Sequence, residues 1–125
     1  MNDLTADLLT RIKNGILREK EEVLIPNTKM NVELLKVLRT EEMIGEVTTV
    51  DEDIKVELLY NDTEPVISTL KRVSKPGQRI YVSAKEIKPV MNGRGISVIS
   101  TSKGLMTGAQ AKSQNIGGEL ICEVW

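Results

Sequence analysis

The chain has 125 residues and a net charge of −1, with 40% apolar and 28% charged residues, a profile that predicts a globular protein with a modest core. No apolar run approaches the roughly 20 residues of a membrane-spanning helix, and the first residues lack the layout of a secretion signal. Without histidine, and with Cys122 as its single cysteine, the chain can assemble neither a histidine–cysteine metal site nor a serine–histidine triad. A lone cysteine fits a reducing compartment, so we expect a cytoplasmic protein.

The first half of the chain predicts alternating helices and strands. Apolar residues recur at helical spacing over residues 3–20, in a helix that Asp3 or Thr5 can cap. The next expected elements are a strand over 23–25, a helix capped by Asn27 or Thr28, and two strands over 47–50 and 54–60. The predicted order is therefore helix, strand, helix, strand, strand.

The second half is predicted to be mostly strand. A strand over 66–73 is expected to pair with one over 79–82 through the turn at 75–78, where the proline and glycine positions favour a type II turn. The later expected elements are a helical turn over 84–88, a strand from Ile96, a short helix from Thr107 to about Gln114, and a final strand over 119–125.

These patterns predict an α+β fold of two small lobes. Residues 1–64 are expected to form an N-terminal α-β-α-β-β lobe, and residues 65–125 a strand-rich C-terminal lobe with one short helix, because residues 61–65 are polar and turn-rich. Residues 1–64 contain 8 Lys/Arg and 15 Asp/Glu, a net charge of −7, whereas residues 65–125 contain 9 and 3, a net charge of +6. This asymmetry favours an anionic partner for the basic half, although two differently solvated surfaces would give the same pattern.

A cluster of hydroxyl side chains follows the apolar strand that begins at Ile96. Its residues combine groups that donate and accept hydrogen bonds, one mobile positive charge and one conformationally free glycine: Ser100, Thr101, Ser102, Lys103 and Gly104. Such a cluster suits a phosphate, a ribose hydroxyl or a base edge. An ordinary polar hairpin turn has the same composition, and the residues alone leave both interpretations open.

Two other short motifs have enzymatic or metal-binding interpretations that fail. Ser100 and Lys103 match the S-x-x-K spacing of serine acyl-enzymes, but that chemistry needs the serine at a helix start and two companion motifs that are absent. The acidic turn at 51–53 lacks the spacing and central glycine of a calcium-binding loop. The sequence therefore predicts no enzymatic activity, no metal and no cofactor.

The C-terminal half has the charge expected of a nucleic-acid-binding surface. Between Leu70 and Gly118 there are nine lysines and arginines and one acidic residue, Glu86; candidates for phosphate contacts include Arg79, Arg94 and Lys112. Only one aromatic residue, Tyr81, lies in this region, so stacking on unpaired bases would be a minor contribution. The better target is a folded RNA helix recognised by its shape and its 2′-hydroxyls.

The run from Gly95 to Thr107, followed by Ala111-Lys112 and Gly117-Gly118-Glu119, resembles bacterial small-subunit ribosomal protein eight. The resemblance extends to residues 72–81 and 7–15, so it covers nearly the whole chain. It implies two α+β lobes and a structural, non-enzymatic role in the small ribosomal subunit. The implied partner is a helix of the central domain of 16S ribosomal RNA, where the protein would help to assemble the 30S platform.

The resemblance also implies which residues contact RNA. The main contacts fall in the C-terminal lobe, at Ser100, Thr101, Ser102, Lys103, Gly104, Tyr81, Asn115, Gly118 and Glu119. Secondary contacts fall in the N-terminal lobe, at Thr5, Arg11, Asn14 and Lys29. A carboxylate at Glu119 would have to accept a base amino group or brace the loop. The neighbours implied are small-subunit proteins five and twelve, with no membrane and no small-molecule substrate.

Two alternatives remain open from the sequence. Some family members also bind the messenger RNA of their own operon and repress its translation, using the same surface. A protein–protein scaffold that docks through the acidic half is the alternative from another class. This half is also where the chain departs from its relatives, which are usually clearly basic, whereas this sequence has a pI near 5.6.

Overall fold

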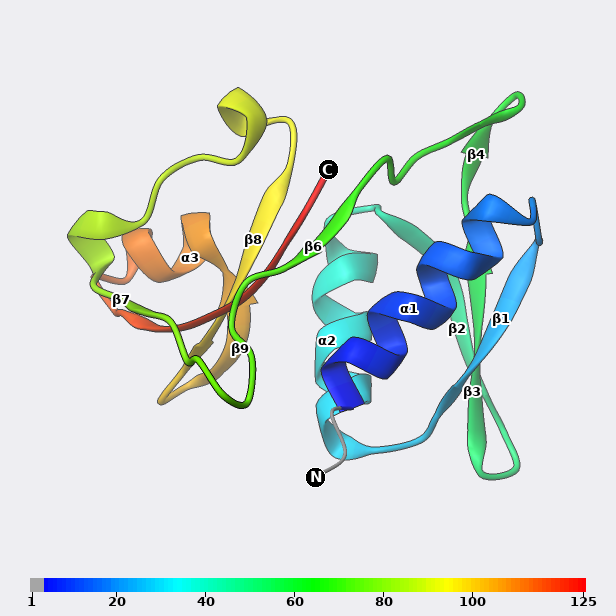
Figure 1. The fold of residues 1–125 in the computed structure, drawn as a ribbon, viewed down its shortest axis with the longest axis horizontal. Helices are drawn as coiled ribbons and strands as arrows, with labels where there is room; N and C mark the ends of the chain where they lie inside the picture. The colour runs from blue at the N-terminus through cyan, green and yellow to red at the C-terminus, as the bar shows by residue number, and fades with distance from the viewer. Residues whose placement is uncertain (1–3) are drawn as a thin grey trace. The chain divides into compact units, whose positions relative to one another are not determined.

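The computed structural model describes residues 4–125 and divides the chain into two compact units (Figure 1). The first unit ends at Ser68 and the second spans Thr69–Trp125, so the division lies four residues after the end of the predicted first lobe at residue 64. Asp3, a predicted helix cap, lies outside the described residues. Within residues 4–125, no helix combines the length and apolar character needed to cross a membrane.

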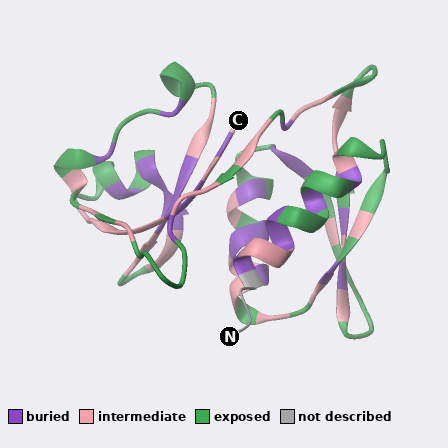
Figure 2. Cartoon of the chain, in the orientation of Figure 1, coloured by how far each residue is buried: buried purple, intermediate pink, exposed green. Residues whose placement is uncertain are grey.

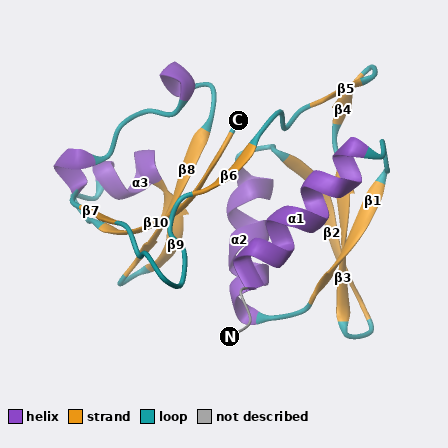
Figure 3. Ribbon diagram, in the orientation of Figure 1, coloured by secondary structure: helices purple, strands orange, loops and turns teal. Residues whose placement is uncertain are grey.

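The first unit contains the predicted helices and strands in the predicted order, followed by a small extra hairpin. Its elements are α1 (Leu4–Leu17), β1 (Glu22–Pro26), α2 (Lys29–Thr40), β2 (Ile44–Val50), β3 (Asp53–Leu58), β4 (Tyr60–Asn61) and β5 (Glu64–Pro65). The three longer strands form an antiparallel sheet in the order β1-β3-β2, and β4 pairs with β5 (Figure 3). The mixed fold confirms the predicted α+β class.

The core of the first unit lies between the sheet and the two helices. Alternate residues of β3, among them Ile54 and Val56, are fully or almost fully buried, and so are Leu8, Ile12, Leu34, Leu35 and Leu38 of the helices (Figure 2). Burying each of these side chains contributes about 1.5–3 kcal/mol. Thr28 caps α2, because its hydroxyl oxygen accepts from the Asn31 backbone N–H at 3.2 Å.

The second unit is a five-stranded antiparallel arrangement with one short helix. Its elements are β6 (Leu70–Arg72), β7 (Tyr81–Val82), the 3₁₀ turns η1 (Ala84–Glu86) and η2 (Met91–Gly93), β8 (Ile96–Thr101), β9 (Gly104–Thr107), α3 (Gly108–Ser113) and β10 (Gly118–Val124). The strand order is β6-β10-β8-β9, and β7 also pairs with β10. Thr107 caps α3 as predicted: its hydroxyl accepts from the Gln110 N–H, and the Gln110 side chain accepts from the Thr107 N–H.

The predicted pairing of residues 66–73 with 79–82 is wrong. Both strands that form there, β6 and β7, pair with β10, and the bridge between Lys75 and Gln78 lies in the turn that separates the two segments. The turn between them is not type II, because among the described glycines only Gly93 and Gly104 have positive φ, and type II requires it at Gly77. Pairing with β10, which is distant in the sequence, therefore replaces the predicted hairpin between neighbouring segments.

The two faces of this sheet differ. One face packs against α3 and the segment around η1. The small core between them consists of Ile87, Ile99, Met106 and Ala111, with Val82 and Leu120 packed against it. Because side chains alternate along a strand, the neighbours of Ile99 and Leu120 project to the other face. That face, at the end of β8, carries the candidate site.

Candidate nucleic-acid interface

The β8–β9 hairpin presents the predicted hydroxyl cluster in a short turn. Thr101 pairs with Gly104 across the hairpin, so Ser102 and Lys103 form its tip, and both are exposed. The Thr101 hydroxyl donates to the Gly104 carbonyl oxygen at 2.8 Å and accepts from the Lys103 backbone N–H at 3.1 Å. Gly104 has a φ of 105°, which glycine adopts without steric cost. Thr101 therefore closes the turn and leaves the two tip side chains facing solvent.

Three further predicted contact residues lie side by side across the sheet. Glu119 on β10 pairs with Ser100 on β8 and with Tyr81 on β7. Residues directly paired across antiparallel strands project to the same face, here the face opposite the small core. Tyr81 is 69% exposed, so its ring is accessible to a base or sugar. We call this end of the sheet the hairpin surface, made of Tyr81, Ser100, Ser102, Lys103 and Glu119.

Glu119 braces the loop that leads into β7. Its Oε2 accepts from the Ser74 hydroxyl at 2.5 Å and from Arg79 Nη1 at 3.0 Å, and the Ser74 oxygen accepts from the Ile80 N–H at 3.2 Å. Burial tends to raise the pKa of Glu119, but the two hydrogen bonds and the nearby guanidinium charges outweigh burial, so the pKa lies below its ordinary value. The ionised carboxylate thus joins β10 to Arg79, one of the predicted phosphate-binding residues.

Gly117 and Gly118 have a packing role. A Cβ on Gly118 would lie 2.2 Å from the Ser100 carbonyl oxygen, and one on Gly117 would lie 2.4 Å from the Val82 carbonyl oxygen. Any side chain there would collide with the backbone of β8 or β7. The two glycines therefore allow the start of β10 to lie close to both strands, and contact of Gly118 with RNA stays a prediction.

Asn115 and Lys112 also have structural roles at the end of α3. Asn115 has a φ of 57°, a left-handed conformation that ends the helix and that asparagine tolerates better than most residues. Lys112 Nζ donates to the Ile87 carbonyl oxygen at 3.1 Å, which ties α3 to the segment after η1. Both residues are exposed, so their predicted contacts with RNA stay predictions.

Arg94 lies away from the hairpin surface. It follows η2 and precedes β8, whereas the hairpin turn follows β8. A strand rises about 3.3 Å per residue, so the ends of this six-residue strand lie roughly 17 Å apart. In Figure 1, η2 and the β8–β9 turn lie at opposite ends of the second unit. The structure therefore does not bring Arg94 together with the other predicted contacts.

The predicted secondary contacts in the first unit differ in accessibility. Thr5 is buried, with 8% of its surface exposed, so its hydroxyl is poorly placed to meet a macromolecule. Lys29, at the start of α2, is exposed. Arg11 is exposed but engaged, because its Nε donates to Asp7 Oδ2 at 3.1 Å and its Nη1 donates to the Leu24 carbonyl oxygen at 3.0 Å.

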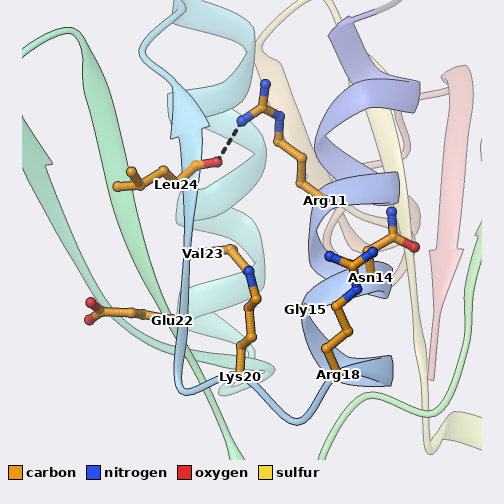
Figure 4. A pocket seen from close by; sticks show the side chains of 8 residues that line it. All are labelled: Arg11, Asn14, Gly15, Arg18, Lys20, Glu22, Val23 and Leu24. Carbon is orange, nitrogen blue, oxygen red and sulfur yellow. Dashed lines mark hydrogen bonds between the residues drawn. The ribbon is translucent and has the colours of Figure 1, made fainter.

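Arg11 and Asn14 line a groove of about 490 Å³ between α1 and β1 (Figure 4). Arg18 and Lys20 line the same groove, together with Glu22. Neither Arg18 nor Lys20 was among the predicted RNA contacts. Arg18 directly follows α1 and continues its last turn, since its N–H donates to the Asn14 carbonyl oxygen, so the seven-residue spacing places it on the same side as Arg11. Three cationic side chains therefore surround a groove that holds two of the predicted secondary contacts.

Comparison with known proteins identifies the family. Residues 3–125 match the model of the family described as Ribosomal protein S8. The chain is 46% identical to the small ribosomal subunit protein uS8 of Nitratidesulfovibrio vulgaris (strain Miyazaki F), over 100% of this chain and 99% of the relative. It is 45% identical to uS8 of Nostoc punctiforme and 47% identical to uS8 of Mesoplasma florum, over at least 98% of each chain. The chain therefore belongs to the ribosomal protein S8 family and is a non-enzymatic structural protein of the small ribosomal subunit.

Proposed function

We propose that the hairpin surface binds a helix of the central domain of 16S ribosomal RNA and so helps to assemble the platform of the 30S subunit. The observation that supports this most strongly is the hairpin tip, where Ser102 and Lys103 are exposed next to Ser100. Hydroxyl groups of this kind can both donate to and accept from ribose 2′-hydroxyls and base edges, and the lysine can neutralise a phosphate.

The proposed mechanism is docking of a rigid surface on a matching RNA shape. The Thr101 hydroxyl fixes the turn before RNA arrives, so little conformational entropy is lost at the tip on binding. Glu119 holds Arg79 in the same way, and the guanidinium remains partly exposed, with 47% of its side-chain surface accessible. Tyr81 adds one exposed ring to the same row of residues.

The groove between α1 and β1 is proposed as the secondary contact with RNA. Arg11 is held by Asp7 and by the Leu24 carbonyl, while Asn14, Arg18 and Lys20 are exposed around it. Several cations around one groove suit contacts with phosphates. On the family resemblance, we further infer that ribosomal proteins five and twelve are neighbours in the subunit and that the protein acts in the cytoplasm.

A salt titration tests this function. Binding of the full chain to a short hairpin from the central domain is measured beside a scrambled hairpin of the same composition, from low to physiological salt. We expect both affinities to fall with salt, while the preference for the cognate hairpin persists because hydrogen bonds at the tip do not depend on counterion release. Equal affinity for both hairpins at every salt concentration would reduce the surface to a general polyanion site and would refute the proposal.

A further inference from the structure

The outer edge of β2 is an open strand edge. In the sheet of the first unit, β2 pairs only with β3, so the backbone groups on its other side have no partner strand within residues 4–125. Thr48, Thr49 and Val50 are all exposed, and no lysine or proline occurs between Ile44 and Val50. Lysine and proline on an edge strand commonly prevent it from pairing with another chain. The last part of this edge is therefore accessible to an added strand.

The segment that forms this edge is acidic, although Arg39 precedes it and Lys55 on β3 lies opposite Thr48. From Thr40 to Ile54 the sequence contains six acidic residues and no lysine or arginine: Glu41, Glu42, Glu46, Asp51, Glu52 and Asp53. All of them except the half-buried Asp53 are exposed. The acidic residues precede, interrupt and follow β2, so an added strand would have carboxylates beside it at both ends.

A groove of about 630 Å³ lies at the start of β2 and includes three of the local carboxylates. It is lined in part by Glu42, Glu46 and Glu57, with Arg39 as its basic residue. Glu57 Oε1 accepts from the Glu46 backbone N–H at 3.1 Å, where the register of β2 and β3 shifts. Glu57 is also directly opposite Glu22 on β1, and like charges in this position are unfavourable until a cation approaches. Lys55 approaches Glu22 only to 3.8 Å.

We propose that an extended, lysine- and arginine-rich segment of another protein adds to the free edge of β2. Backbone hydrogen bonds would provide the pairing and the flanking carboxylates would select a basic partner, as in other cases of strand addition. Pairing between two copies of this chain at the same edge is disfavoured, because it would bring the two sets of carboxylates together. This proposal concerns the first unit, which we call the acidic unit, and it is independent of RNA binding by the hairpin surface.

The test uses the ¹⁵N-labelled full chain and a synthetic peptide of alternating lysine and valine, matched to β2 in length. We expect saturable binding, the largest amide shifts in residues 44–50 and slower hydrogen exchange there. A peptide of the same composition with a methylated backbone should not bind, because it lacks N–H donors. Glu46→Lys should weaken binding at least about tenfold and Glu46→Gln less, whereas the control Glu21→Lys should leave it unchanged.

Three results would overturn the proposal. Equal binding of the methylated peptide would mean that charge alone attracts it. Amide shifts spread over the acidic residues, without protection of β2, would exclude strand addition. Concentration-dependent protection of β2 without any peptide would assign the edge to a second copy of the chain instead.

Discussion

Arg79 and Glu119 lie 40 residues apart in the sequence, and Arg79 Nη1 donates to Glu119 Oε2 at 3.0 Å. This ion pair joins the loop before β7 to the start of β10, and the Ser74 hydroxyl reinforces it from the same loop. The pair accounts for an acidic residue on the hairpin surface, because Glu119 positions the Arg79 guanidinium there.

The pH dependence of stability should report on Glu119. A carboxyl group whose pKa is lowered by folding contributes stability that is complete above its ordinary pKa of about 4.3 and is lost as the pH falls through the lowered value. Glu119→Gln should lower the free energy of unfolding by about 1–2 kcal/mol at neutral pH. The variant should also lose less stability than the wild type as the pH falls. Urea unfolding between neutral and acidic pH measures this, with Glu52→Gln, an exposed glutamate, as the control. Parallel curves for wild type and Glu119→Gln would contradict the assigned role.

Thr101 and Ser102 are neighbours with different predicted roles. Thr101→Val removes both hydrogen bonds that close the turn, so we expect a loss of about 1–2 kcal/mol of stability together with weaker RNA binding. Ser102→Ala should weaken specific binding by a similar amount and leave the melting temperature unchanged, because the side chain is exposed. Thermal melts and RNA titrations of both variants distinguish the roles. A large drop in melting temperature for Ser102→Ala would make that hydroxyl structural.

Lys103→Ala tests the predicted phosphate contact at the hairpin tip. Each phosphate contact adds about one unit to the slope of log affinity against log salt, so this variant should lower the slope by roughly one. Lys36, exposed on α2 in the acidic unit, offers a matched control, and Lys36→Ala should leave the slope unchanged. Identical slopes for wild type and Lys103→Ala would remove Lys103 from the phosphate contacts.

Gly118→Ala should destabilise the second unit, because the new Cβ would lie 2.2 Å from the Ser100 carbonyl oxygen. We expect a cost of about 1–3 kcal/mol or more, the usual range for overpacking. Gly77→Ala is the control, since a Cβ added there would meet no atom within 4 Å and the φ of Gly77 is not positive. That variant should be neutral or slightly stabilising. Chemical denaturation compares the two, and equal stabilities would refute the packing role of Gly118.

Cys122 should be inert to thiol reagents in the folded protein. It is fully buried on β10, and burial, aided by the charge of Glu123, raises the pKa of its thiol to about 12. Cys122 should therefore react with a disulfide reagent only when the second unit unfolds, and the rate of this reaction should rise with urea concentration. Rapid labelling of the native protein at neutral pH would show that this part of the sheet opens more readily than its burial indicates.

The sequence predicts best what local chemistry determines. The Thr107 cap and the helix after it could be identified because a capping residue and its partner at Gln110 are three positions apart. The pairing of β6 and β7 could not, because the Pro-Gly turn favours a local hairpin and the strand that wins, β10, lies more than 30 residues beyond that turn. The bracing role of Glu119 needs this pairing, since it depends on which strands become neighbours.

The arrangement of β10 has a consequence for synthesis. This strand follows all of its partners in the sequence and pairs with β6, β7 and β8. A nascent chain that has emerged only as far as α3 can form the β8–β9 hairpin but has no strand to which β6 and β7 can attach. The acidic unit, whose strands are complete by Pro65, can therefore fold while the rest is still being made. The sheet of the basic second unit closes in one late step, once Val124 has left the ribosome that produced it.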